Sequence, residues 1–175
     1  MDGISKSIFL WGVICLLGFG VYHFSLFDPN FPKPLPLWSV LTVIGIAAMV
    51  LWVPAWSKNK IVLAWIVITV VGMLYHWAAM SRLVPMFLQP GAYWALLMTI
   101  GFAATAFFNI PIHKKFWWGV TVLNGILFLS LTFAGRDIGS YSLLLLAIFS
   151  GVPLMVEPFY VAHKRTTATG KPASA

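Results

Sequence analysis

The chain has 175 residues, of which 61% are apolar and only 9% are charged, whereas a soluble domain carries about 25% charged residues, so a soluble globular enzyme is excluded. The net charge is +7, but the basic residues form no continuous patch, which excludes a nucleic-acid-binding surface. The single cysteine, Cys15, excludes an internal disulfide and any cysteine-based metal cluster.

Six apolar segments are long enough to cross a membrane as helices, because about 20 residues cover its ~30 Å hydrocarbon core. In chain order these segments are 7–27, 36–56, 60–80, 91–110, 116–134 and 141–162. Polar or proline-containing turns separate them at 28–36, 57–60, 89–91, 112–115 and 135–137. We therefore predict an all-α integral membrane protein, a compact six-helix transmembrane bundle. It forms one domain over residues 1–165, with a disordered polar tail at 166–175.

The first segment also has the basic residue and apolar run of a secretory signal. No small-x-small cleavage site precedes Asp28, and the apolar run is long for a signal. We therefore expect this segment to be retained as a transmembrane helix.

The basic residues predict the orientation of the bundle, since cytoplasmic loops are enriched in lysine and arginine. Eight lie on the side of the two termini: Lys6, Lys58, Lys60, Lys114, Lys115, Lys164, Arg165 and Lys171. Three lie on the other side: Lys33, Arg82 and Arg136. We expect both termini in the cytoplasm and the protein in the inner or plasma membrane of the cell.

Tryptophans fall near both predicted membrane interfaces, where amphipathic rings collect. Those assigned to the outer interface are Trp38, Trp77 and Trp94, and those assigned to the inner one are Trp11, Trp56, Trp117 and Trp118. The sequence thus predicts an aromatic belt at each interface.

The chain resembles itself at a shift of 53 to 56 residues. A shift of 53 places Tyr22-His23 on Tyr75-His76, and a shift of 56 places Trp38 on Trp94 and Gly45 on Gly101. The third pair of segments matches less well, with Trp65 on Trp118. We predict three helical-hairpin repeats, the third diverged, with small residues making the internal helix contacts.

Two histidines occupy equivalent positions of the predicted repeat, each between a tyrosine and another aromatic residue. The pattern of Tyr22-His23 and Tyr75-His76 is typical of an interfacial belt, and the same residues are candidates for ligand contact. A third interpretation is ligation of haem b by His23 and His76, because two helical histidines at one depth suit haem iron. We predict no cofactor or metal, with haem kept as the alternative.

Glu157 and Asn124 are two further polar residues within predicted spans, where such groups need a partner, a proton or water. Glu157 lies between Pro153 and Pro158. It is either paired with His113 or a nearby lysine, or it is a proton-coupled or ligand-binding carboxylate. Asn124 lies mid-span, where it forms an interhelical hydrogen bond or, if a cavity exists, contacts a ligand.

Three classes of function remain, since the chain contains no catalytic motif and an enzyme is not favoured. The leading one is a transporter or ligand-binding membrane protein for a small or lipophilic solute. The second is a non-catalytic accessory subunit of a larger membrane complex, and the third is a haem-binding redox protein. Expected partners are the lipid bilayer and either further copies of the chain or other membrane subunits.

Overall fold

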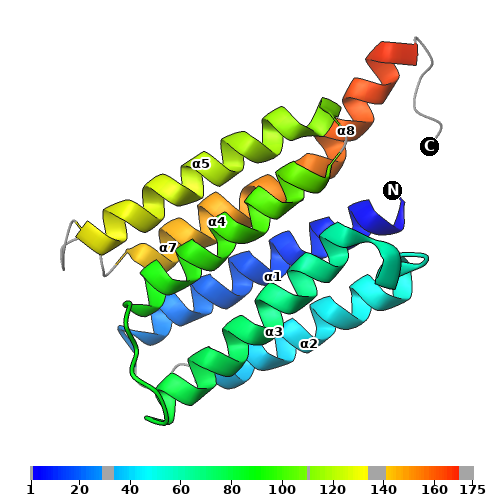
Figure 1. Ribbon diagram of the computed structural model, residues 1–175. Coiled ribbons are helices and arrows are strands. Elements are labelled where there is room, and N and C mark those ends of the chain that lie inside the picture. The colour runs from blue at the N-terminus through cyan, green and yellow to red at the C-terminus, as the bar shows by residue number, and fades with distance from the viewer. Residues whose placement is uncertain (1, 29–33, 110, 134–140, 170–175) are drawn as a thin grey trace.

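The structure, a computed structural model, describes residues 2–28, 34–109, 111–133 and 141–169, and every regular element in them is helical (Figure 1). The elements are α1 (Gly3–Ser25), α2 (Pro34–Trp52), the short η1 (Trp56–Lys58), α3 (Lys60–Met80), α4 (Pro90–Phe108), α5 (Pro111–Phe133), α7 (Ser142–Leu146), the π-helical η2 (Ala147–Gly151) and α8 (Val152–Thr169). The last three follow one another directly and form the sixth long helix. Within the described residues, six helices are long and apolar enough to cross a membrane, as the hydropathy pattern predicts.

Side-chain caps determine where two of the helices begin. The carboxylate of Asp2 accepts a hydrogen bond from the backbone N–H of Ser5 at 2.8 Å, so α1 begins at Gly3 rather than at residue 7. The side chain of Asn59 accepts hydrogen bonds from the N–H groups of Ile61 and Val62 at 3.0 and 3.3 Å. Helix α3 accordingly starts at residue 60, where the sequence predicts it.

The connection between α4 and α5 differs from the predicted turn at 112–115. Helix α5 already begins at Pro111, whose fixed φ suits the first position of a helix. His113, Lys114 and Lys115 therefore belong to the first turns of α5. Helix α8 extends to Thr169, and residues 170–175 of the predicted tail lie outside the described part of the chain.

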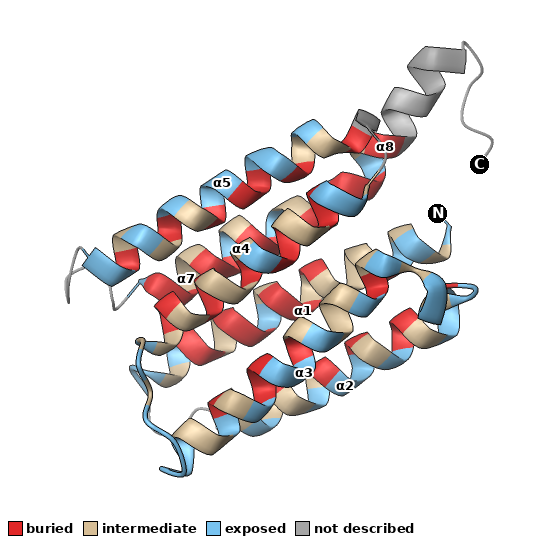
Figure 2. Cartoon of the chain, in the orientation of Figure 1, coloured by how far each residue is buried: buried red, intermediate tan, exposed pale blue. Residues whose placement is uncertain are grey.

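The helices run side by side, and the N-terminus of α1 and the C-terminus of α8 lie at the same end of the bundle (Figure 1). We call this the terminal end and the opposite one, where α3 connects to α4, the far end. Buried residues face the interior of the bundle, whereas the outward faces are exposed (Figure 2). These outward faces remain apolar, as at Leu51, which is 78% exposed, and Leu74. Such faces are compatible with contact to lipid.

Gly45 and Gly101 make internal helix contacts, and each of them receives an indole ring rather than a neighbouring backbone. A Cβ added to Gly45 would lie 2.6 Å from Cζ2 of Trp11, and one added to Gly101 would lie 2.5 Å from Cη2 of Trp65. Gly45 on α2 and Gly101 on α4 thus provide the space that Trp11 of α1 and Trp65 of α3 occupy.

The π-helical turn in the sixth helix is tied to Asn124 of α5. Pro153 has no N–H to donate to the carbonyl of Phe149, and the Asn124 amide donates to that oxygen instead, at 3.2 Å. The same amide donates to the carbonyl of Val120 at 3.0 Å, and its oxygen accepts from Ser150 Oγ at 2.8 Å. The interhelical hydrogen bond predicted for Asn124 is therefore confirmed.

Candidate ligand-binding site

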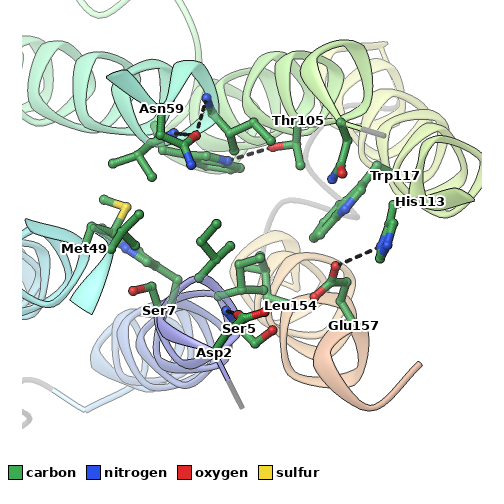
Figure 3. A pocket seen from close by; sticks show the side chains of 18 of the residues that line it. Asp2, Ser5, Ser7, Met49, Asn59, Thr105, His113, Trp117, Leu154 and Glu157 are labelled. Carbon is green, nitrogen blue, oxygen red and sulfur yellow. Dashed lines mark hydrogen bonds and ion pairs between the residues drawn. The ribbon is translucent and has the colours of Figure 1, made fainter. Parts of the chain in front are cut away.

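A cavity of about 200 Å³, which we call the vestibule, lies between the helices at the terminal end. All six long helices contribute to its walls, and their side chains converge on it (Figure 3). Its lining includes Asp2, Ser7, Ile8, Trp11, Met49, Asn59, Val62, Trp65, Thr105, His113, Trp117, Leu154 and Glu157. Because the exposed Asp2 belongs to this lining, the vestibule reaches the surface at the terminal end.

A second cavity of about 40 Å³, the inner chamber, continues the vestibule toward the far end. The two share Ile8, Trp11, Trp65 and Leu154 in their linings. The other residues that line the inner chamber are Cys15, Trp38, Thr42, Thr69, Trp94 and Met98. The two cavities are therefore adjacent parts of one site with a mostly aromatic and aliphatic wall.

Aromatic rings close the inner chamber toward the far end. The indoles of Trp38 and Trp94 stack with centroids 5.6 Å apart, and Phe19 meets both edge-on, at 4.7 and 6.1 Å. All three side chains are buried. The site is thus accessible from one end of the bundle and blocked at the other.

Polar groups gather at the mouth of the vestibule. His113 Nδ1 lies 3.5 Å from a carboxylate oxygen of Glu157, and both side chains are buried (Figure 3). This pair joins α5 to α8, because α5 begins early enough to carry His113. The predicted pairing of Glu157 with His113 is confirmed, and the same carboxylate lines the vestibule, as expected of a ligand-binding candidate.

The structure does not bring the other predicted site residues to this cavity. Asn124 is completely buried, but it lines neither the vestibule nor the inner chamber. Tyr22, His23, Tyr75 and His76 lie near the far end and line neither cavity either. Of the six predicted candidates, only Glu157 belongs to the site.

Each of the two histidines has its own surroundings at the far end. His76 Nδ1 accepts a hydrogen bond from Trp94 Nε1 at 2.9 Å, and its ring lies 6.3 Å from that of Tyr22. His23 packs against Phe27 and Tyr141, with ring centroids 5.1 and 6.1 Å away. Aromatic side chains fill the space around both rings, so this geometry lends no support to the haem alternative.

Tyr75, the tyrosine of the second Tyr-His pair, makes structural hydrogen bonds. The hydroxyl of Tyr75 donates to the carbonyl of Pro85 at 2.8 Å and accepts from the N–H of Phe87 at 3.4 Å. Tyr75 therefore holds the connection between α3 and α4 against the end of α3.

Several tryptophans that the sequence assigns to the membrane interfaces lie instead in the walls of the site. Trp11, Trp38, Trp94 and Trp117 are predicted at the membrane interfaces, yet all four line a cavity. Trp38, Trp94 and Trp117 are at most 3% exposed, so the belt prediction is wrong for them. Trp11 and Trp38 pack against glycines of neighbouring helices, Gly45 and Gly18, and these contacts between helices are what the hydropathy pattern does not contain.

Comparison with known proteins adds no family to this description. No family model matches the chain, and neither a curated protein nor a solved structure is significantly similar to it.

Proposed function

We propose that this chain is a multi-pass protein of the inner or plasma membrane that binds a small, largely apolar solute in the vestibule and transports it. The vestibule is the observation that carries the proposal. An apolar cavity of about 150 Å³ is enough to bind benzene, and this one has about 200 Å³ with walls from all six helices. A solute of about the size of naphthalene fits such a space.

Access from one end supports transport rather than storage. The vestibule opens at the terminal end, and the stacked indoles of Trp38 and Trp94 close the chamber beyond it. Transporters alternate between states that open a central site to one side at a time. The eight-to-three distribution of basic residues supports a terminal end that faces the cytoplasm. The described state is then the inward-open one.

Paired contacts support a repeat of the first two hairpins. Trp11 covers Gly45 as Trp65 covers Gly101, and Trp38 lies against Gly18 as Trp94 lies near Gly72. The corresponding residues of the two hairpins are a nearly constant distance apart in the chain. Trp11 and Trp65 are 54 residues apart, as are Gly18 and Gly72. Gly45 and Gly101 are 56 residues apart, as are Trp38 and Trp94. In transporters built from internal repeats, the substrate site lies where the repeats meet, and the Trp38–Trp94 stack joins the two hairpins.

The third hairpin follows a different pattern, in keeping with divergence. Trp118 of α5, which the repeat matches with Trp65, is exposed instead of packed on a glycine. The third hairpin contributes the Glu157–His113 pair to the mouth. We assign Glu157 the role of a polar contact for the solute as it enters.

Binding is tested with 2-ethylnaphthalene and the purified protein in lipid nanodiscs. A ligand at 100 times its Kd stabilises the folded state by about 2.7 kcal/mol, which a thermal-unfolding measurement detects. Leu154→Phe and Val62→Phe fill the vestibule and are expected to abolish this stabilisation. Val43→Phe is the matched control, since Val43 is 66% exposed on the outer face of α2. If the ligand stabilises the vestibule variants as much as the control, it binds outside the vestibule.

Transport is tested in a Cys15→Ala background with two single-cysteine variants. Ser7→Cys lines the vestibule, which opens at the terminal end, and Tyr22→Cys is buried near the far end. A small charged thiol reagent is applied to one side of the membrane at a time. Transport requires that Ser7→Cys react from the terminal side and that Tyr22→Cys react from the far side when solute is present. Reaction from the terminal side alone would show a binding protein that does not transport.

A further inference from the structure

Three buried donors lining the inner chamber have no hydrogen-bond partner within the described part of the chain. They are the indole N–H groups of Trp11 and Trp38 and the hydroxyl of Thr42. Trp38 is 3% exposed and Thr42 is 6% exposed, so bulk water does not reach them. Leaving a buried donor unsatisfied is costly, and most such groups are paired in native proteins.

The same fold supplies acceptors to the corresponding groups of the second hairpin. Trp65 donates to Thr105 Oγ1 at 2.8 Å, and Trp94 donates to His76 Nδ1 at 2.9 Å. Met49 stands where the 56-residue shift would place the counterpart of Thr105. The hydroxyl of Thr105 also donates to the carbonyl of Gly101 at 2.9 Å. The indole donors of the first hairpin therefore have no acceptor among the described residues of the chamber wall, whereas the corresponding donors of the second hairpin each have one.

The chamber also defines the charge of what these donors receive. Within the described residues, its lining contains no lysine, arginine or carboxylate. An ion there would lack a counter-charge in an apolar environment, which costs far more than placing a neutral group. A volume of about 40 Å³ accommodates one small polar group, while an apolar body occupies the vestibule.

We propose that the solute carries a neutral hydrogen-bond acceptor, such as a ketone or ester carbonyl. Its oxygen enters the inner chamber and accepts hydrogen bonds from Trp11, Trp38 and Thr42, and its apolar part lies in the vestibule. This inference rests on the proposed function and adds the chemical class of the solute to it.

Two probes of nearly equal shape test the inference. 2-Acetylnaphthalene carries a carbonyl where 2-ethylnaphthalene carries a methylene, and both are titrated into the protein in nanodiscs. The ketone is expected to bind at least about fivefold more tightly, the gain from one net hydrogen bond. Thr42→Val keeps the shape of the side chain, and Trp38→Phe keeps an aromatic ring. Each is expected to reduce the preference for the ketone, which is the ratio of the two affinities measured on the same variant, by about fivefold.

Trp118→Phe is the matched control, because Trp118 is exposed and lines neither cavity. It is expected to keep the preference for the ketone. Equal affinity for the two probes would overturn the inference and leave the proposed function standing. If neither probe binds, both the inference and the proposed function are overturned. Tighter binding of the cationic 1-(2-naphthyl)ethylamine than of the ketone would also overturn the inference.

The acceptor has two sources, a free solute or the ester carbonyl of a membrane lipid. Nanodiscs of ether-linked phospholipids contain no ester carbonyl and separate them. If a lipid ester occupies the chamber, the ketone binds more tightly in ether-linked than in ester-linked nanodiscs. Equal affinity in both supports a free solute. Either result is compatible with the neutral acceptor, provided that Thr42→Val removes the preference for the ketone.

Discussion

Trp38 and Trp94 stack almost in parallel, with ring planes 9° apart and centroids at 5.6 Å, although α2 and α4 are not consecutive helices. The two indoles nevertheless differ in their polar contacts. Trp94 donates to His76, whereas the N–H of Trp38 has no partner in the described part of the chain. The stack therefore joins the second hairpin, whose indole donors have acceptors, to the first hairpin, whose unpaired donors we assign to a ligand. It also closes the chamber between the two hairpins.

His76 is expected to stabilise the Trp38–Trp94 stack, because its Nδ1 accepts a hydrogen bond from Trp94 Nε1. His76→Phe leaves Trp94 Nε1 buried without a partner and should lower the free energy of unfolding by about 1–3 kcal/mol. Denaturant titration in micelles, followed by circular dichroism, measures the change. Tyr75→Phe removes a hydrogen bond at an exposed position and is expected to cost less. An equal cost for both variants would contradict the importance of the buried contact.

Gly101 is expected to tolerate no larger residue. In Gly101→Ala the new Cβ meets the Trp65 ring at 2.5 Å, and overpacking of this kind costs about 1–3 kcal/mol. Gly119→Ala on α5 is the matched control, because no atom lies within 4 Å of its added Cβ. Thermal unfolding of the two variants compares them directly. Similar melting temperatures would show that Trp65 moves aside freely.

Asn124 is expected to contribute stability without contacting the ligand. Asn124→Leu leaves the carbonyl of Phe149 and the hydroxyl of Ser150 without the bonds that Asn124 makes. The expected loss is about 1–3 kcal/mol of unfolding free energy. Binding of 2-ethylnaphthalene, measured well below the melting temperature, should remain. Loss of binding by a folded Asn124→Leu protein would restore Asn124 as a site residue.

The Glu157–His113 pair is expected to couple α5 to α8. A double-mutant cycle of Glu157→Gln and His113→Gln should give a coupling energy of about 0.5–3 kcal/mol, the range for residues in contact. Glu157→Gln keeps the shape of the side chain and removes its charge. A coupling energy near zero, together with loss of pH-dependent uptake in Glu157→Gln, would indicate a proton-coupling role instead.

The orientation is expected to follow the distribution of lysine and arginine. In a Cys15→Ala background, a cysteine at Phe87, between α3 and α4, should react with an impermeant reagent applied to intact cells. Phe87 is 80% exposed. A cysteine at Lys58, in η1, should react only after the cells are opened. The reverse pattern would place the termini outside.

Local sequence was sufficient for the helices and for one polar contact of the site. Hydropathy depends on composition within about 20 residues, so the six spans follow from it, and α3 has its predicted bounds. The pairing of Glu157 with His113 was also foreseeable, because a carboxylate in an apolar helix needs a partner near it. Helix ends were predicted less well, since they depend on single caps such as Asp2 and on Pro111.

Only tertiary packing decided which aromatic residues face the interior. A tryptophan has the same composition signal at a lipid interface as in a buried wall, and what separates Trp38 from the exposed Trp77 is the helix opposite it. Likewise, Trp11 lacks a partner and Trp65 has one because residues on other helices, Met49 and Thr105, stand at related positions. The cavity and its unpaired donors arise from contacts between distant segments, which no local pattern encodes.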